Sequence, residues 1–295
     1  MKVKKYGMFI LNTTFDLLTF TYLKLTQKFP KVMSIEDTLQ LIINEQKSFA
    51  RYGDGEFNLI SNKSIGFQSA NQELSKRLRE ILTSNPTFCL ICIPGSLNTL
   101  SGMVWKSQLM WAHLISRFYK NYKQYLNYEI IYPNSLMTRP YIDLKNKDRS
   151  VILFKKIKSI WEDRDILIIE GEHSKLGIGN DLFDNAKSIR RVITLSKDAF
   201  SKYDEILEEV KHYDKNSIIL IALGAAATVL AYDLSELGFQ ACDIGHIDIE
   251  YEWFLKKSLR KTAVDGKFVN EVSTENPTTM INDMNYENQI IKKIV

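Results

Sequence analysis

Two short runs of aliphatic residues constrain the fold more than any other feature of the sequence. Residues 166–169 and 218–221 contain no polar side chain, so neither run has a side suited to water. Strands that are apolar on both faces are typical of the centre of a parallel sheet covered by helices on both sides. The chain is therefore predicted to be an α/β protein with a Rossmann-like, mainly parallel sheet flanked by helices.

The rest of the chain alternates short apolar runs with amphipathic segments, as successive βαβ units require. Further strands are predicted at 88–93, 129–132, 192–195 and 241–244. Helical or amphipathic segments are predicted to begin near Ser34 and to cover 71–82, 103–122, 151–161, 182–188, 203–213, 226–237 and 286–294. We expect an N-terminal extension over 1–33, one domain over 34–272 and a polar C-terminal tail with a short helix over 273–295.

The amino-acid composition limits the kinds of molecule that the chain is expected to bind. The net charge of the 295 residues is only +4, and basic residues are scattered among acids, which gives nucleic acid little to bind. The three cysteines, Cys89, Cys92 and Cys242, cannot all be paired and indicate a reducing, cytoplasmic environment. Cys89 and Cys92 have redox or zinc spacing, but their apolar neighbours favour a buried strand.

The N-terminal segment allows two interpretations. Three early lysines precede an aromatic-rich amphipathic helix predicted over residues 6–25, which suits either the inner face of a membrane or packing on the domain. Asp16 interrupts the apolar run, which argues against a signal peptide or a spanning helix. Nothing in the sequence indicates the oligomeric state.

Residues 51–57 form a glycine-broken, charged motif. Asp54 and Glu56 flank Gly55 and follow Gly53, so two carboxylates can offer oxygen ligands to a hard divalent cation without crowding. The alternative is a polar turn whose acids face solvent. The motif predicts a site for Mn²⁺ or Mg²⁺, with Arg51 as a neighbouring phosphate partner.

Other polar residues gather where predicted strands end, which in parallel sheets is where ligands bind. Backbone donors for a phosphate are predicted in the glycine-rich loop after 166–169 and in the small-residue turn after 218–223. The candidate donor-binding residues are Arg51, Arg139, Gly177, Gly179, Asn180, Asp181, Gly224 and Thr228.

A histidine and two acids follow the last predicted strand. If the chain stays extended there, alternation places His246, Asp248 and Glu250 on one side, opposite two isoleucines. Such a cluster can relay a proton, hold a metal or anchor sugar hydroxyls. These three residues are the candidate catalytic groups, and the sequence does not rank them.

Taken together, these segments resemble the bacterial glycosyltransferases of the GT-D fold, a family first described as a domain of unknown function. The resemblance runs from about 34 to 270 and is carried by 51–57, 138–143, 170–171, 177–183, 222–224, 227–234 and 243–253. One departure lies at 224–228, where relatives are expected to read Gly-Pro-Thr-Ala-Thr and this chain has Gly-Ala-Ala-Ala-Thr.

The resemblance implies transfer of a sugar, typically glucose from UDP-glucose, to a glycan acceptor with a divalent metal served by Asp54 and Glu56. Two other readings use the same residues. One is a metal-dependent phosphohydrolase of sugar nucleotides, with water as the acceptor. The other is a non-catalytic nucleotide-sugar-binding subunit of a membrane-associated glycan assembly.

Overall fold

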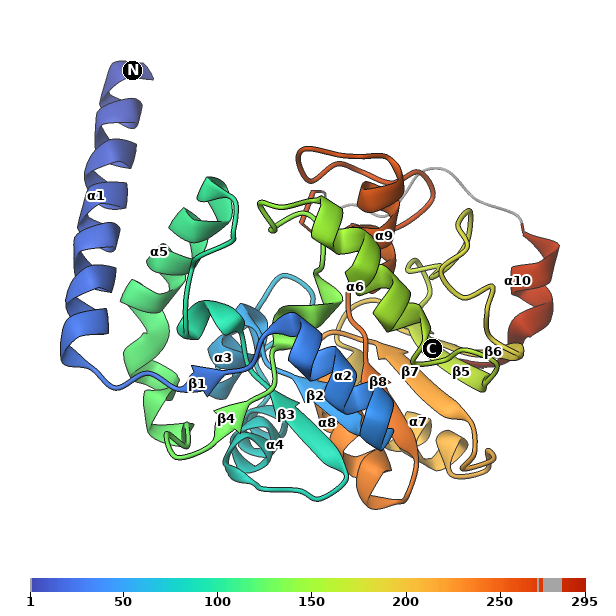
Figure 1. Ribbon diagram of the computed structural model, residues 1–295. Coiled ribbons are helices and arrows are strands. Elements are labelled where there is room, and N and C mark those ends of the chain that lie inside the picture. Colours follow the sequence, from blue (N-terminus) through green and yellow to red (C-terminus); the bar gives the residue numbers. More distant parts are fainter. Residues whose placement is uncertain (1, 270, 273–282) are drawn as a thin grey trace.

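A seven-stranded sheet forms the centre of the computed structural model, which describes residues 2–269, 271–272 and 283–295, with the backbone alone for 2–13 (Figure 1). Its strands are β2 (Ser48–Arg51), β3 (Cys89–Cys92), β5 (Asp165–Gly171), β6 (Ser188–Thr194), β7 (Ile218–Ala222), β8 (Gln240–Asp243) and β9 (Ile290–Ile294). They are ordered β3-β2-β8-β7-β5-β6-β9, and every pair is parallel. The predicted fold class is confirmed.

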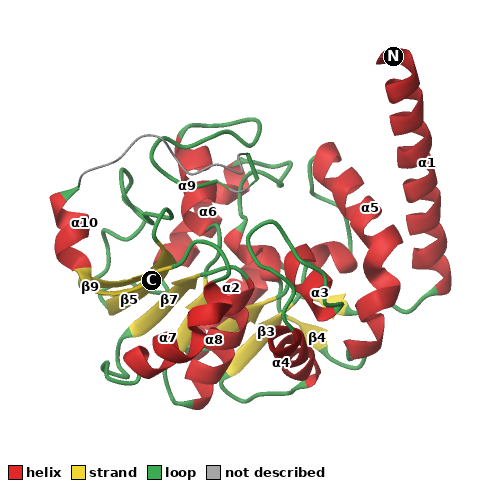
Figure 2. Cartoon of the chain, turned by 180° about the vertical axis from the view of Figure 1, so that it is seen from behind, coloured by secondary structure: helices red, strands yellow, loops and turns green. Residues whose placement is uncertain are grey.

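Helices cover both faces of this sheet (Figures 1 and 2). They are α2 (Ile35–Glu45), α3 (Asp54–Ile60), α4 (Gln72–Thr83), α5 (Trp105–Tyr122), α6 (Asp148–Lys158), α7 (Tyr203–Val210), α8 (Ala225–Glu236) and α9 (Ile247–Leu255). Short 3-10 helices lie at Gly95–Leu97, Lys123–Tyr125, Ser135–Thr138 and Ala199–Lys202, and β1 (Lys31–Val32) pairs with β4 (Ile131–Tyr132) beside the main sheet.

The two aliphatic runs occupy the middle strands β5 and β7, where successive residues serve different cores. Ile219 and Ile221 pack in the cluster that includes α4, α7 and α8. Ile218 and Leu220 pack in the cluster that includes α2, α6 and α9. Both faces of β7 are therefore buried, and this explains why the run contains no polar residue.

Two predicted helices are wrong. Residues 182–187 form turns and bends that lead directly into β6 at Ser188, so the connection between β5 and β6 carries no helix. The segment predicted as a helix over 286–294 is divided between α10 (Met284–Gln289) and β9, which pairs with β6 at the edge of the main sheet. Tertiary pairing overrides helical periodicity here, because the Thr194 hydroxyl and the β6 backbone both bind this strand.

The N-terminal helix α1 (Lys2–Thr26) stands beside α5 (Figures 1 and 2). Asp16, only 5% exposed, binds His113 Nδ1 at 2.6 Å and Arg117 Nε at 3.1 Å. The acid that interrupts the apolar run is thus a contact to the domain, which supports packing on α5 for this part of the helix. None of the helices within the described residues is long and apolar enough to cross a membrane.

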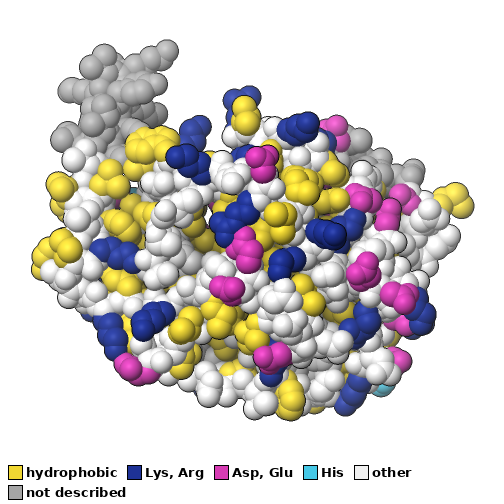
Figure 3. All heavy atoms as spheres, viewed as in Figure 1, with side chains coloured by type: hydrophobic (Ala, Val, Ile, Leu, Met, Phe, Trp, Pro, Cys, Tyr) yellow, Lys and Arg dark blue, Asp and Glu magenta, His cyan; other side chains and the backbone are white. Residues whose placement is uncertain are grey.

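The face shown in Figure 3 mixes acidic, basic and apolar side chains without a continuous basic area. That mixture of charges on this face agrees with the low net charge of the sequence.

Candidate active site

One cavity of about 460 Å³ opens at the carboxyl ends of the parallel strands. Arg51 ends β2, Gly171 ends β5, Ser196 follows β6, Ala222 ends β7 and Gly245 follows β8, and all five line it. The opposite wall comes from α3, α5 and the 3-10 turn at 135–138. The position is the one that the strand-end rule predicts, and the volume lies in the usual range for small-molecule sites.

The motif at 51–57 joins β2 to α3, and its residues 51–56 line this cavity. Asp54 is the first residue of α3 and is exposed, while the Glu56 carboxylate turns back and accepts the Gly53 N–H at 2.7 Å. Burial, together with the negative charge of Asp243, raises the pKa of Glu56 to about 7. The segment is therefore a capped helix start with both acids lining the cavity, rather than a solvated turn.

Arg51 is held beside this motif by Asp243, a residue that the sequence analysis did not select. Its Nη2 lies 2.7 Å from Asp243 Oδ1, and Thr228 Oγ1 donates to the Arg51 carbonyl at 2.9 Å. A Cβ on Gly245 would lie 2.0 Å from Arg51 Nη2, so glycine is required for the close approach. Thr228 is fully buried beneath the cavity and supports Arg51 instead of lining the wall.

Arg139 lines the cavity and is also paired. Its guanidinium forms a bidentate contact with Glu271, at 2.7 and 2.8 Å, and its Nε lies 3.5 Å from Glu250 Oε1. Lys261 Nζ lies 3.3 Å from the same Glu271. Although burial opposes it, the charge of Arg139 lowers the pKa of Glu271 to about 2. Glu271 and Lys261, both in the segment after α9, are site residues that the sequence analysis missed.

The extended arrangement predicted for His246, Asp248 and Glu250 is wrong, because α9 begins at Ile247. Each residue turns the helix by about 100°, so side chains two apart diverge. His246 and Asp248 line the cavity, whereas Glu250 lies behind it and accepts the N–H groups of Tyr141 and Ile142.

Burial moves the pKa values of this group in opposite directions. It lowers the pKa of His246 to about 4, which leaves a neutral imidazole at pH 7. It raises the pKa of the Glu250 carboxyl to about 7.

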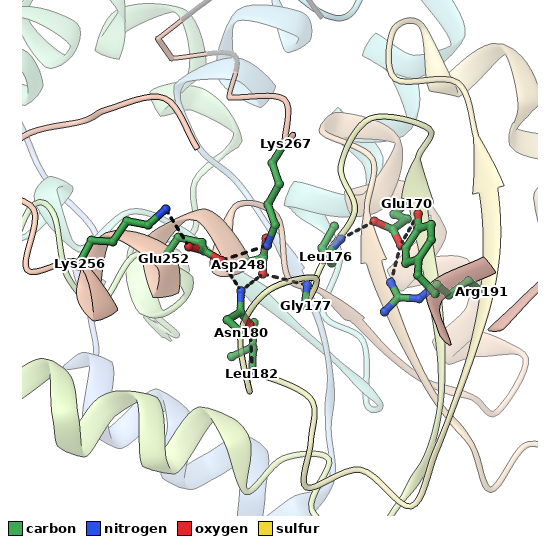
Figure 4. Close-up of polar contacts among 11 residues, drawn as sticks. Glu170, Leu176, Gly177, Asn180, Leu182, Arg191, Asp248, Glu252, Lys256 and Lys267 are labelled. Carbon is green, nitrogen blue, oxygen red and sulfur yellow. Dashed lines mark hydrogen bonds and ion pairs between the residues drawn. The ribbon is translucent and has the colours of Figure 1, made fainter. Parts of the chain in front are cut away.

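Asp248 is tied into a buried polar network (Figure 4). Its Oδ1 accepts the Gly177 N–H and the Asn180 amide, each at 2.8 Å, and its Oδ2 accepts Lys267 Nζ at 2.7 Å. Asn180 also donates to Glu252 at 2.7 Å. These hydrogen bonds use both carboxylate oxygens, so Asp248 fixes the loop after β5 to the segment that contains Lys267.

The glycine-rich loop therefore has a different position from the one predicted. Gly177, Gly179, Asn180 and Asp181 do not line the cavity; Gly171, Ser174 and Leu176 of the same connection do. Asp181 binds Lys158 and Tyr251 on the far side of the loop.

The turn before α8 does line the cavity, as predicted. Gly224 has φ +55°, and a Cβ there would lie 2.3 Å from the Phe67 ring. The helix starts at Ala225, so its first backbone N–H groups point toward the carboxyl ends of the strands. Phe67 itself also lines the cavity, and no periodic or charged pattern in its sequence neighbourhood identifies it.

The donor set suits a metal that is shared with a ligand. Among the described residues no group of three or more histidine, cysteine, aspartate or glutamate side chains is arranged to hold an ion. Asp54 and Glu56 supply two carboxylates, and Mg²⁺ commonly binds through one or two carboxylates, water and substrate phosphates. The residues present therefore fit a cation that arrives with a phosphorylated substrate.

The model of the family described as "Glycosyltransferase GT-D fold" matches residues 49–272, which span this whole cavity. The chain belongs to this family. This membership confirms the resemblance that the motifs indicated. It also confirms the predicted class of enzyme, a glycosyltransferase.

Solved structures show the same fold. A domain of unknown function 1792 with "a distinct glycosyltransferase fold" is 34% identical, has a TM-score of 0.89, and matches over 95% of this chain and 100% of that chain. A glycosyltransferase (DUF1792) from Streptococcus sanguinis is 37% identical, with a TM-score of 0.87, over 90% of this chain and 100% of that chain.

Curated relatives are longer. "Glycosyltransferase GlyD" of Streptococcus pneumoniae serotype 4 is 35% identical over 266 residues, 90% of this chain and 33% of that protein. "Probable glycosyl transferase Gly" of Streptococcus gordonii is 37% identical over 265 residues, 89% of this chain and 39% of that protein. The chain thus spans between a third and two fifths of these relatives.

Proposed function

We propose that this chain transfers a sugar, with glucose the first candidate, from a UDP-sugar to a bacterial glycan acceptor, using Mn²⁺ or Mg²⁺ held by Asp54 and Glu56. The observation that carries the proposal is the cavity at the strand ends, where these two acids face basic side chains in a volume suited to a nucleotide sugar.

The charges of the cavity wall support the need for a metal. The lining carboxylates are Asp54, Glu56, Asp143, Asp248 and Glu271, and the lining basic residues are Arg51, Arg139, Lys197 and Lys261. A diphosphate brings further negative charge into a wall where acids already outnumber bases. A divalent cation balances that charge, and when bound it would stabilise the charge that develops on the departing UDP.

The protein groups around the diphosphate have distinct tasks in this proposal. Arg51, fixed by Asp243, stands next to the two acids, and the start of α8 after Gly224 offers backbone N–H groups to an anion. Arg139 also binds a phosphate in this proposal, after its bidentate contact with Glu271 breaks.

His246 is the better candidate for the base that accepts the proton of the acceptor hydroxyl. Its imidazole lines the cavity and is unprotonated at pH 7, although a pKa lowered to about 4 makes it a weak base. Asp248 and Glu250 are less suitable, since backbone and side-chain donors already occupy the Asp248 oxygens and Glu250 lies outside the cavity.

The test is UDP release from a panel of UDP-sugars after chelation and after Mn²⁺ is restored. We expect Asp54→Asn and Glu56→Gln each to lower kcat/KM by at least about tenfold. Glu73→Gln is the matched control, because Glu73 is an exposed acid in the first turn of α4, away from the cavity. Undiminished turnover in both cavity variants would refute the metal assignment, and UDP release that needs no glycan acceptor would identify a hydrolase.

A further inference from the structure

The α5 wall of the cavity contains a buried hydrogen-bond donor with no partner. Trp111 lines the cavity and is 5% exposed, yet its indole N–H makes no hydrogen bond to any described residue. Buried donors are nearly always satisfied, so an orphan donor in a cavity wall is a candidate partner for a group of the ligand.

Other buried polar atoms also lack a hydrogen bond. Eight buried side-chain atoms of the described residues lack a hydrogen bond, and four of them belong to Trp111, Thr138, Arg139 and Glu250. The last two face each other at 3.5 Å, too far for a hydrogen bond. Of the last three residues, Arg139 lines the cavity, whereas Thr138 and Glu250 do not.

A carboxylate acceptor stands in the same wall. Asp143 is 7% exposed and lines the cavity, and its Oδ1 accepts the Ser107 hydroxyl of α5 at 2.6 Å. Its Oδ2 lies 3.7 Å from Arg139 Nε, beyond hydrogen-bond distance. One oxygen therefore fixes the carboxylate to α5, and the other retains capacity for a ligand hydroxyl.

The third element of the wall is apolar. Met110 lines the cavity beside Trp111, and its unbranched thioether side chain adapts readily to the shape of a ligand. A pyranose ring matches this combination, because its hydroxyls both donate and accept while its C–H face packs on apolar and aromatic surface.

We propose that Trp111, Asp143 and Met110 form a pyranose-binding subsite on the α5 wall. The indole N–H donates to one sugar hydroxyl, Asp143 Oδ2 accepts from another, and Met110 shifts to admit the ring. The inference deepens the proposed function, on which it rests. The ring belongs either to the sugar of the donor or to the terminal sugar of the acceptor, and the two sources share this chemistry.

The experiment uses Trp111→Phe, which keeps an aromatic ring and removes the N–H, and Asp143→Asn. Trp105→Phe is the matched control, because Trp105 lies on the same helix, is 64% exposed and does not line the cavity. Calorimetry with Mn²⁺ measures binding of UDP and of UDP-glucose. Saturation-transfer NMR with UDP present measures binding of the methyl glycosides of glucose and N-acetylglucosamine.

We expect both cavity variants to bind the sugar-bearing probe about five- to thirtyfold more weakly, with the affinity for UDP changed less than twofold. Weakening confined to UDP-glucose identifies the donor sugar, and weakening confined to the methyl glycosides identifies the acceptor. Unchanged binding of both probes, or an equal loss for UDP itself, overturns the subsite. These binding measurements do not depend on turnover, so an inactive wild-type chain would refute the proposed function without deciding the subsite.

Discussion

Replacing Lys267 by methionine isolates the buried charge that secures the cavity wall. The Lys267 side chain is 1% exposed, and its Nζ lies 2.7 Å from Asp248 and 3.3 Å from Glu252 (Figure 4). Methionine preserves most of the apolar stem and removes the ammonium group. Asp248 and Glu252 then remain buried next to each other without their shared cation.

The expected magnitude follows from that burial. Breaking a buried ion pair by removing one partner costs about 3–5 kcal/mol, and Asn180 and Lys256 compensate Glu252 in part, so we expect about 3 kcal/mol. For a domain of this size that corresponds to a fall in Tm of roughly 6–12 °C. Phe268 and Glu271, which follow Lys267 in the chain, also line the cavity, so UDP binding is expected to weaken as well.

Lys256→Met is the matched control, since Lys256 binds the same Glu252 at 3.2 Å but its side chain is 52% exposed. A solvent-exposed pair contributes about 1 kcal/mol or less and weakens with salt. Urea unfolding, followed by tryptophan fluorescence at low and high ionic strength, measures both variants. Equal losses for Lys256→Met and Lys267→Met would refute the structural role of the buried network.

Two further predictions concern Gly224 and His246. Gly224→Ala is expected to lose about 1–3 kcal/mol of stability and most donor binding, because it combines a positive φ with a Cβ 2.3 Å from the Phe67 ring. Gly238→Ala is the control, because Gly238 also has a positive φ, +88°, but the atom nearest to an added Cβ would be 3.7 Å away. Urea unfolding measures the stability of both variants, and a larger loss of stability for Gly238→Ala would contradict the steric argument. Burial lowers the pKa of His246 to about 4. Between about pH 6.5 and pH 4, the imidazole is therefore protonated in the unfolded chain but not in the folded chain. The free energy of unfolding therefore falls by up to roughly 3 kcal/mol as pH falls from about 6.5 to about 4. His246→Asn should abolish this pH-dependent loss of stability. An unchanged pH dependence in the variant would show that His246 is not buried in its uncharged form.

The sequence was sufficient for the architecture because the architecture depends on local patterns. Residues 166–169 and 218–221 are apolar at every position, and only central parallel strands bury both faces in that way. The strand-end rule then located the cavity. The helix predicted over 286–294 was wrong because hydrophobic periodicity alone did not identify the strand. The residues of β9 are as compatible with a helix as with a strand, and only pairing with the edge of β6 decides between them.

The candidate site was predicted in part for a related reason. Asp54, Glu56, Arg51 and Gly224 lie in compact motifs at strand ends, where local spacing indicates chemistry, and all four line the cavity. The site residues that were missed contact partners far away in the sequence, and no local spacing reveals such pairs. They are Asp243 with Arg51, Phe67 with Gly224, and Glu271 with Arg139. Glu250 was misassigned because an extended chain and a helix place it on different sides of the same segment.

The most direct test of the account is a crystal structure of the chain with UDP and Mn²⁺. We expect the cation between the diphosphate and the carboxylates of Asp54 and Glu56, with Arg51 and the start of α8 close to the phosphates. A nucleotide bound outside the strand-end cavity, or a cation held by neither of the two acids, would contradict it.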